Sequence, residues 1–157
     1  MNRQEIIDLT KEILVHPTVG YLATISADGL PEIRAVENFR CPEIYNAFPA
    51  NFLTELEEDP LTIYFSTNTS SEKMKQLKKN NNVAVYFCIP KEFKGVMFQG
   101  KMAIINDMDF KKKIWFDECL QFYPLGPEDP DFTILKMKPK RLKAWFKGKH
   151  EVIFSEQ

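Results

Sequence analysis

The chain has 157 residues, 44% of them hydrophobic and 13% aromatic, which is enough apolar material for one substantial core. We therefore expect a single domain that spans residues 1–157. The 21 lysines and arginines nearly balance the 22 aspartates and glutamates, and a formal net charge of -1 excludes a strongly basic nucleic-acid binder. The three cysteines are widely and irregularly spaced and match neither a disulfide framework nor a zinc motif, so we expect reduced thiols.

The first expected element is an amphipathic helix over Arg3–Val15, because apolar residues recur there at helical spacing until Pro17 ends the pattern. Acidic residues among these apolar positions argue against a signal peptide, and no later apolar run is long enough to cross a bilayer. We therefore expect a cytoplasmic protein that does not enter membranes. Residues 19–39 follow as two strands joined at Asp28-Gly29, a strong signal for a hairpin turn.

Residues 40–60 contain three prolines and show no sustained period, which predicts a long loop with one short helix. Strand and helix patterns then alternate to the end of the chain. The further expected strands are 61–67, 83–89, 95–106, 133–146 and 151–154, and the further expected helices are 70–80 and 110–122. About six strands in hairpin-like succession, with three helices beside them, favour a mainly β (α+β) fold, a six-stranded antiparallel barrel with peripheral helices.

Three candidate sites have ordinary structural explanations. Residues 95–101, GVMFQGK, fit the start of a P-loop, but Met102 stands where that motif needs serine or threonine, and the segment has the pattern of a strand. Neither His16 nor His150 has around it the set of cysteines or carboxylates that a metal site needs, so we expect no metal site. The basic stretch 136–149 alternates as a strand does, which predicts a solvated face and not a nucleic-acid surface.

A polar joint at residues 66–73, STNTSSEK, connects a predicted strand to a predicted helix. Thr69 and Glu72 fit a capping box, in which their side chains satisfy backbone donors at the start of the helix. Alternatively, the free N–H groups and the positive end of the helix dipole form a phosphate cradle together with the hydroxyls and Lys73. The local sequence supports both alternatives equally.

The order and spacing of four segments are similar to those of the pyridoxamine 5′-phosphate oxidase-like flavoproteins. The segments are 20–36, 63–87, 98–106 and 125–146, so the resemblance covers most of the chain. It implies a split β-barrel that binds FMN, with sites that lie across a homodimer interface. The general-stress-protein and nitroimidazole-reductase types within this family are the most similar ones.

The resemblance also implies which residues contact the cofactor. It assigns the phosphate to Arg34, Ser71 and Lys73, whose charges and hydroxyl suit a dianionic group. It assigns the flavin ring to the second hairpin strand and to the strand end at 66–67, with an aromatic side chain approaching from the partner subunit. The residues at these positions are Ile33, Arg34, Ala35, Val36, Ser66, Thr67 and Trp145.

Three departures from the oxidases themselves bear on the substrate. Gly95 stands where the oxidases carry a glutamine that contacts the flavin, and the 40–60 segment is longer than the usual connection. The residues that bind the vitamin substrate near the oxidase C-terminus have no counterpart here. We therefore do not expect oxidation of pyridoxamine phosphate.

No nucleophile, metal set or acid–base pair emerges from the sequence, so no catalytic residue is assigned. The leading hypothesis is a homodimeric FMN-dependent oxidoreductase that passes electrons from a donor to a small planar acceptor, such as a nitroaromatic or a quinone. The alternatives are a non-catalytic, stress-associated flavin-binding protein and a barrel that holds heme or a deazaflavin. The aromatic residues Tyr45, Phe48, Phe52 and Trp115 either form a wall for the acceptor or belong to the core.

Overall fold

A computed structural model describes residues 2–147 and 150–155. The strands are β1 (Val19–Ile25), β2 (Pro31–Glu37), β3 (Ile63–Asn68), β4 (Asn82–Ile89), β5 (Lys94–Ile105), β6 (Phe132–Phe146) and β7 (His150–Ser155). The α-helices are α1 (Arg3–Leu14), α2 (Pro42–Tyr45), α3 (Ala50–Glu58), α4 (Glu72–Lys79) and α5 (Met108–Ile114). Short 3₁₀ helices occupy Pro90–Glu92, Asp117–Gln121 and Gly126–Glu128.

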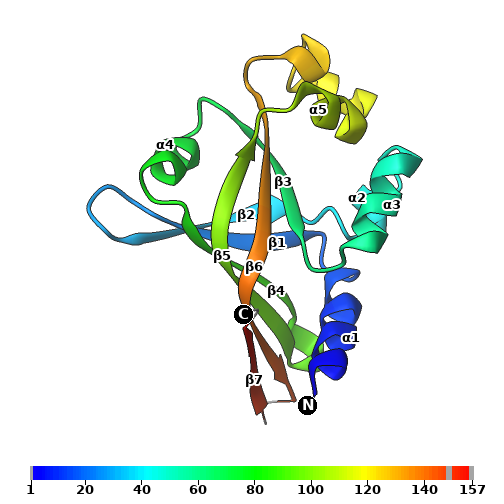
Figure 1. The fold of residues 1–157 in the computed structure, drawn as a ribbon, viewed down its shortest axis with the longest axis vertical. Coiled ribbons are helices and arrows are strands. Elements are labelled where there is room, and N and C mark those ends of the chain that lie inside the picture. Colours follow the sequence, from blue (N-terminus) through cyan, green and yellow to red (C-terminus); the bar gives the residue numbers. More distant parts are fainter. Residues whose placement is uncertain (1, 148–149, 156–157) are drawn as a thin grey trace.

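Six strands form one curled antiparallel sheet in the order β2-β1-β4-β5-β6-β3, and β7 pairs with β6 beside it (Figure 1). The predicted fold, a six-stranded antiparallel split β-barrel with peripheral helices, is confirmed. The long strand β6 pairs with β5 from Ile134 to Phe146, and on its other edge it pairs first with β3 and then with β7. A bulge between Gln99 and Gly100, opposite Pro139, bends this central pair, because proline has no N–H for the ladder.

Two predicted local elements at the N-terminal end are confirmed. Helix α1 begins with a capping box between Asn2 and Glu5 and buries one apolar face. The hairpin of β1 and β2 turns through Gly29, whose φ of 83° is a left-handed conformation that favours glycine. No described helix combines the length and apolar character that crossing a membrane requires.

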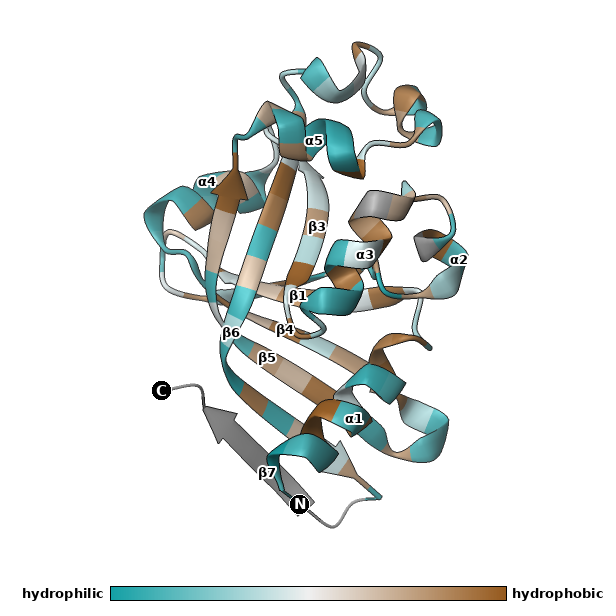
Figure 2. Ribbon diagram, turned by 45° about the vertical axis from the view of Figure 1, so that its right-hand side comes forward, coloured by the Kyte–Doolittle hydropathy of each residue, from teal (hydrophilic) through white to brown (hydrophobic). Residues whose placement is uncertain are grey.

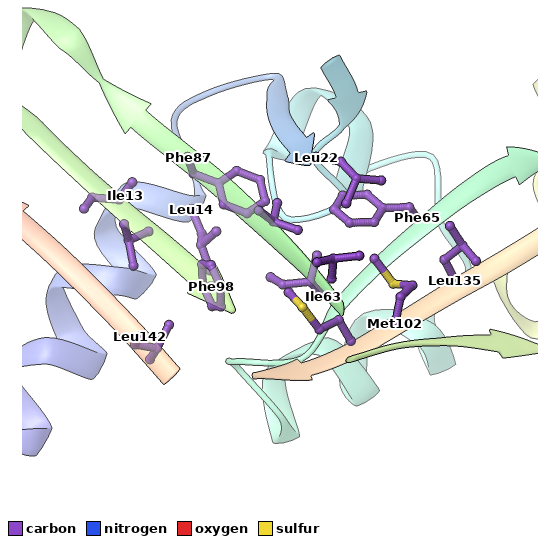
Figure 3. Close-up of a cluster of buried hydrophobic side chains, with 14 of the residues drawn as sticks. Ile13, Leu14, Leu22, Ile63, Phe65, Phe87, Phe98, Met102, Leu135 and Leu142 are labelled. Carbon is purple, nitrogen blue, oxygen red and sulfur yellow. The ribbon is translucent and has the colours of Figure 1, made fainter. Parts of the chain in front are cut away.

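The barrel interior holds the larger hydrophobic core. Alternate residues of the strands and one face of α1 meet there, and Figure 3 shows their side chains pointing toward one another. Hydrophobic residues concentrate along the strands, whereas α4 and α5 carry many hydrophilic ones (Figure 2). The basic segment predicted to be solvated alternates as expected, because Lys138 and Lys140 are exposed while Met137 and Leu142 are buried. The near-P-loop lies within the continuous strand β5, which confirms the strand interpretation.

A second core lies on the other face of β3 and corrects the prediction for residues 40–60. That segment contains two helices, α2 and α3, instead of a loop with one helix. Phe48 and Phe52 are 5% and 0% exposed and pack with Tyr64, Phe132 and their neighbours. Because β3 is covered on both faces, its residues are buried without alternation.

The aromatic residues considered for an acceptor wall therefore belong mainly to this second core. Phe48 and Phe52 are buried, and Trp115 packs edge-to-face on Phe132 with ring centroids 5.1 Å apart. The side chain of Tyr45 lies outside the described part of the structure. The predicted helix over 110–122 is wrong in extent, because α5 ends at Ile114 and the backbone is extended at Trp115 and Phe116 before a 3₁₀ turn.

Candidate functional site

A pocket of about 460 Å³ lies where the sheet stays open, between its two terminal strands β2 and β3. In the described ladders, β2 pairs only with β1 and β3 only with β6, so each strand has one free edge. The pocket is lined by residues 34–37 of β2, residues 66–68 of β3, Lys73 of α4 and six residues between 116 and 123. Its volume lies in the range of roughly 300–1,000 Å³ typical of small-molecule sites.

Arg34 is one of two cations in the lining and is held by a buried polar network. Its guanidinium donates to Thr24 Oγ1 at 2.5 Å and to Gln76 Oε1 at 3.3 Å, and it forms an ion pair with Glu32 at 3.4 Å. Thr24 and Gln76 are 0% and 4% exposed, so the side chain is fixed between β1 and α4. Burial lowers the pKa of Arg34 below its usual value, an effect that the charge of Glu32 opposes. The guanidinium nevertheless keeps its positive charge, because arginine does not lose its proton in proteins.

Lys73, in the first turn of α4, is the second cation. Its Nζ donates to Thr67 Oγ1 at 2.7 Å, and no described carboxylate forms an ion pair with it. Burial lowers the pKa of Lys73 from its usual 10.5, and the neighbouring positive charge of Arg34 lowers it further. Among the described residues, Glu32 is the one carboxylate that forms an ion pair with either cation, so Arg34 and Lys73 together favour the binding of an anion.

The start of α4 differs from the predicted capping box. The N-cap is Ser71, while Thr69 Oγ1 donates to the carbonyl of Pro130 at 2.8 Å and is hydrogen-bonded to Thr133 Oγ1 at 2.6 Å. Glu72 instead pairs with exposed Lys75 at 3.1 Å. The capping-box interpretation is therefore wrong, because partners more than 60 residues away engage Thr69.

Ser71 has an unused polar atom at this helix start. Its Oγ is buried and makes no hydrogen bond to any described residue. A buried hydroxyl without a partner costs roughly 1–3 kcal/mol, so native proteins seldom retain one without a reason. The hydroxyl stands two residues before Lys73, at the positive end of the α4 dipole. The residues present therefore suit a phosphate group, which accepts hydrogen bonds from hydroxyl, ammonium and guanidinium donors.

The opposite wall comes from residues 116–123, which follow α5. Tyr123 is 5% exposed and donates to Asn68 Oδ1 at 3.1 Å, which ties this segment to the end of β3. Burial raises the pKa of Tyr123 to about 12 and that of Cys119 to about 11. Both groups are therefore protonated at neutral pH, so Cys119 does not offer a thiolate nucleophile.

The structure brings together most of the residues implied by the resemblance. Those that line the pocket are Arg34, Ala35, Val36, Ser66, Thr67 and Lys73. Ser71 is not part of the lining, and is the N-cap of α4 two residues before Lys73. Ile33 points away from the lining and is 71% exposed. Trp145 lies on the C-terminal half of β6 and packs edge-to-face on Tyr86 with ring centroids 5.8 Å apart, outside this pocket.

Sequence reasoning missed three contributors to this site. Gln76 follows Lys73 by three positions and so lies on the same face of the helix, a spacing that could have identified it. Thr24 is a polar residue at an inward position of a strand, which is a weaker signal. The 116–123 segment has no signal in the sequence, because its position depends on how the long connection between β5 and β6 folds back.

Comparisons with known proteins identify the family and the fold. The family model for pyridoxamine 5′-phosphate oxidase matches residues 6–146. The chain is 28% identical over 151 residues to general stress protein 26 of Bacillus subtilis, and the match covers 94% of both chains. The crystal structure of a protein related to general stress protein 26 from Clostridium acetobutylicum has a TM-score of 0.75 and 28% identity, and covers 99% of this chain and 96% of that one.

A more distant structural neighbour is a pyridoxamine 5′-phosphate oxidase-related, FMN-binding protein from Nostoc punctiforme. It superimposes with a TM-score of 0.68 at 17% identity, and the match covers 99% of this chain and 90% of that one. At this level of identity, the likeness concerns the fold.

Proposed function

The chain belongs to the pyridoxamine 5′-phosphate oxidase family, and from this premise we propose that it is a flavoprotein whose single domain binds FMN between β2 and β3. Arg34, Ser71 and Lys73 hold the phosphate in this proposal. One observation carries this proposal. The cations Arg34 and Lys73 line one pocket, and the buried hydroxyl of Ser71, two residues before Lys73, has no hydrogen-bond partner among the described residues. Heme and deazaflavin are the alternatives, and the visible spectrum together with the mass of the compound released by heat distinguishes them.

The flavin ring lies along the free edge of β2 in this proposal. Backbone groups of Ile33–Val36 that face away from β1 have no strand partner in the described ladders, so they are available to the polar edge of the ring. Ser66 and Thr67 contact the cofactor from the facing end of β3. FMN, when bound, supplies the electron-transfer chemistry, while the chain binds it, orients it and excludes water.

We further propose that the working unit is a homodimer in which Trp145 of one subunit approaches the FMN of the other. The outer face of the sheet supports this proposal, because Tyr21 is 41% exposed and the strand registers set it beside Ala35 and Tyr86. Tyr86 in turn lies against Gly95, where its hydroxyl leaves no room for a β-carbon. This apolar surface suits a two-fold interface with two equivalent sites.

The dimer proposal predicts that Tyr21→Arg shifts the protein toward monomer. An arginine buried there without a partner is expected to weaken association by roughly tenfold or more, measured by sedimentation over a concentration series. Leu30→Arg is the matched control, because Leu30 is 62% exposed at the hairpin turn. A wild-type monomer that holds one FMN per chain contradicts the proposal.

The proposed reaction is reduction of a small, planar, electron-poor acceptor, such as a nitroaromatic or a quinone, by an oxidoreductase that acts in the cytoplasm. Among the residues that line the pocket, Tyr123 and Cys119 keep their protons at neutral pH, so neither supplies a base. This reaction needs no base: FMN, when bound, would supply the electrons, solvent would supply the protons that the acceptor takes up, and the chain would hold the acceptor in position.

The test mixes chemically reduced holoprotein with a nitroimidazole, a quinone or oxygen in a stopped-flow instrument. If the chain orients the acceptor, reoxidation by an organic acceptor should proceed at least about tenfold faster than that of free reduced FMN. Rates equal to those of free FMN, with tight FMN binding retained, favour the alternative of a non-catalytic, stress-associated flavin-binding protein.

A further inference from the structure

We call the part of the pocket formed by Glu37, Glu118, Phe116 and Phe122 its mouth. It carries two carboxylates, and neither is among the charges that shift the pKa of Arg34 or of Lys73. Glu37 ends β2 and Glu118 belongs to the 116–123 segment, and both line the pocket. Each raises the pKa of the Cys119 thiol through its negative charge, so the two groups flank the same point. Neither forms an ion pair with a residue in the described part of the chain.

The charges of the pocket are therefore separated. Arg34 and Lys73 influence each other at one end, where a phosphate dianion would neutralise their combined charge. The carboxylates of Glu37 and Glu118 then dominate the rest of the lining. A second molecule that enters beside the cofactor experiences a negative potential, which favours cations and repels anions.

Two aromatic rings share this mouth. Phe116 is fixed edge-to-face on Phe48 with centroids 5.1 Å apart, so its orientation is set by the second core. Phe122 is 67% exposed although it belongs to the pocket lining. Exposed aromatic faces beside carboxylates attract a planar cation both through the quadrupole of the ring and through direct charge.

From this combination we infer that the pocket mouth, formed by Glu37, Glu118, Phe116 and Phe122, selects planar cationic aromatic molecules over neutral or anionic ones. The ligand class is an N-alkylated heteroaromatic cation. The inference rests on the proposed function, because FMN is what fills the cationic end of the pocket.

The test measures binding to the oxidised holoprotein, with no electron donor present. N-methylacridinium, acridine and acridine-9-carboxylate have nearly the same ring system and differ in charge, and their fluorescence reports binding directly. We expect the cation to bind roughly tenfold more tightly than acridine in low salt, and the anion to bind more weakly than acridine. High salt should reduce the advantage of the cation to about twofold, because the carboxylates are exposed.

Two kinds of variant measure separately how much the carboxylate charges and the aromatic ring contribute to cation binding. Glu37→Gln with Glu118→Gln should weaken cation binding by about fivefold and leave acridine unchanged. Phe122→Leu keeps an apolar side chain without a π face and should weaken cation binding by about two- to fivefold. The control, Glu43→Gln with Glu58→Gln, removes two exposed carboxylates outside the lining and should change nothing.

A separate FMN titration of each protein distinguishes failure of the proposed cation selection from failure of the flavoprotein proposal. If wild type binds FMN but binds the three probes equally, or if the control pair matches the Glu37 and Glu118 pair, the selection of cations is wrong and the flavoprotein proposal stands. If wild type does not bind FMN, both fail together.

Discussion

Replacement of Lys73 by alanine is expected to weaken FMN binding by about ten- to a hundredfold, which corresponds to the roughly 1.5–3 kcal/mol of one charge-assisted hydrogen bond. Lys73 already stands in the pocket beside Arg34 with no described carboxylate paired to it, so its charge is available to the ligand. Fluorescence titration with FMN and with riboflavin measures the effect. Riboflavin lacks the phosphate, so its affinity should be nearly unchanged.

Two further variants sharpen this prediction. Lys75→Ala on the same helix removes an exposed cation that pairs with Glu72, and should leave FMN affinity within about twofold of wild type. Ser71→Ala removes a buried hydroxyl that has no described partner, so the protein without FMN should be as stable as wild type or slightly more stable, while FMN affinity falls. Equal losses for FMN and riboflavin in Lys73→Ala contradict the phosphate assignment.

Replacement of Phe52 by alanine is expected to lower the free energy of unfolding by about 3–5 kcal/mol, the range for deletion of a fully buried phenylalanine ring. Phe52 is 0% exposed, and its ring makes edge-to-face contacts with Phe48 at 5.1 Å and with Tyr64 at 5.5 Å. The cavity left behind would lie between α3 and β3. Urea unfolding, followed by circular dichroism, measures the change in free energy.

Phe93→Ala is the control for this change, because Phe93 is 74% exposed and its loss should alter stability by less than about 0.5 kcal/mol. A loss below about 1 kcal/mol in Phe52→Ala contradicts a structural role for the 40–60 segment and restores the interpretation of its aromatic residues as a wall for the acceptor. The second core also positions the pocket mouth, because Phe48 contacts both Phe52 and Phe116.

Local pattern determined much of the fold from the sequence alone. The hairpin of β1 and β2, helix α1 and the alternation of β6 follow from hydrophobic period and turn chemistry, which depend on residues close together in the chain. The resemblance to a known family added the prediction of a split barrel, because several weak motifs occur in a specific order along the chain. Arg34, Thr67 and Lys73, predicted from separate segments, then lie in one pocket.

The tertiary structure decided the features whose partners lie far apart in the sequence. Thr69 and Glu72 satisfy the local pattern of a capping box, yet Thr69 bonds to Pro130 and Thr133, because the β3–β6 ladder brings these residues within reach. The 40–60 segment lacks a period of its own and becomes helical where it covers the outer face of β3. Tertiary packing overrides weak local preference in such cases.

The pocket mouth is the clearest feature that only the tertiary structure decided. Glu37 and Glu118 are more than 80 positions apart, and each is an ordinary exposed glutamate in its own segment. They share a pocket because the 116–123 segment folds back to the end of β3, where the Tyr123 hydroxyl donates to Asn68. Hydrophobic period and turn residues determine which strands form, whereas the packing of a long connection against a strand end determines which charges face a ligand.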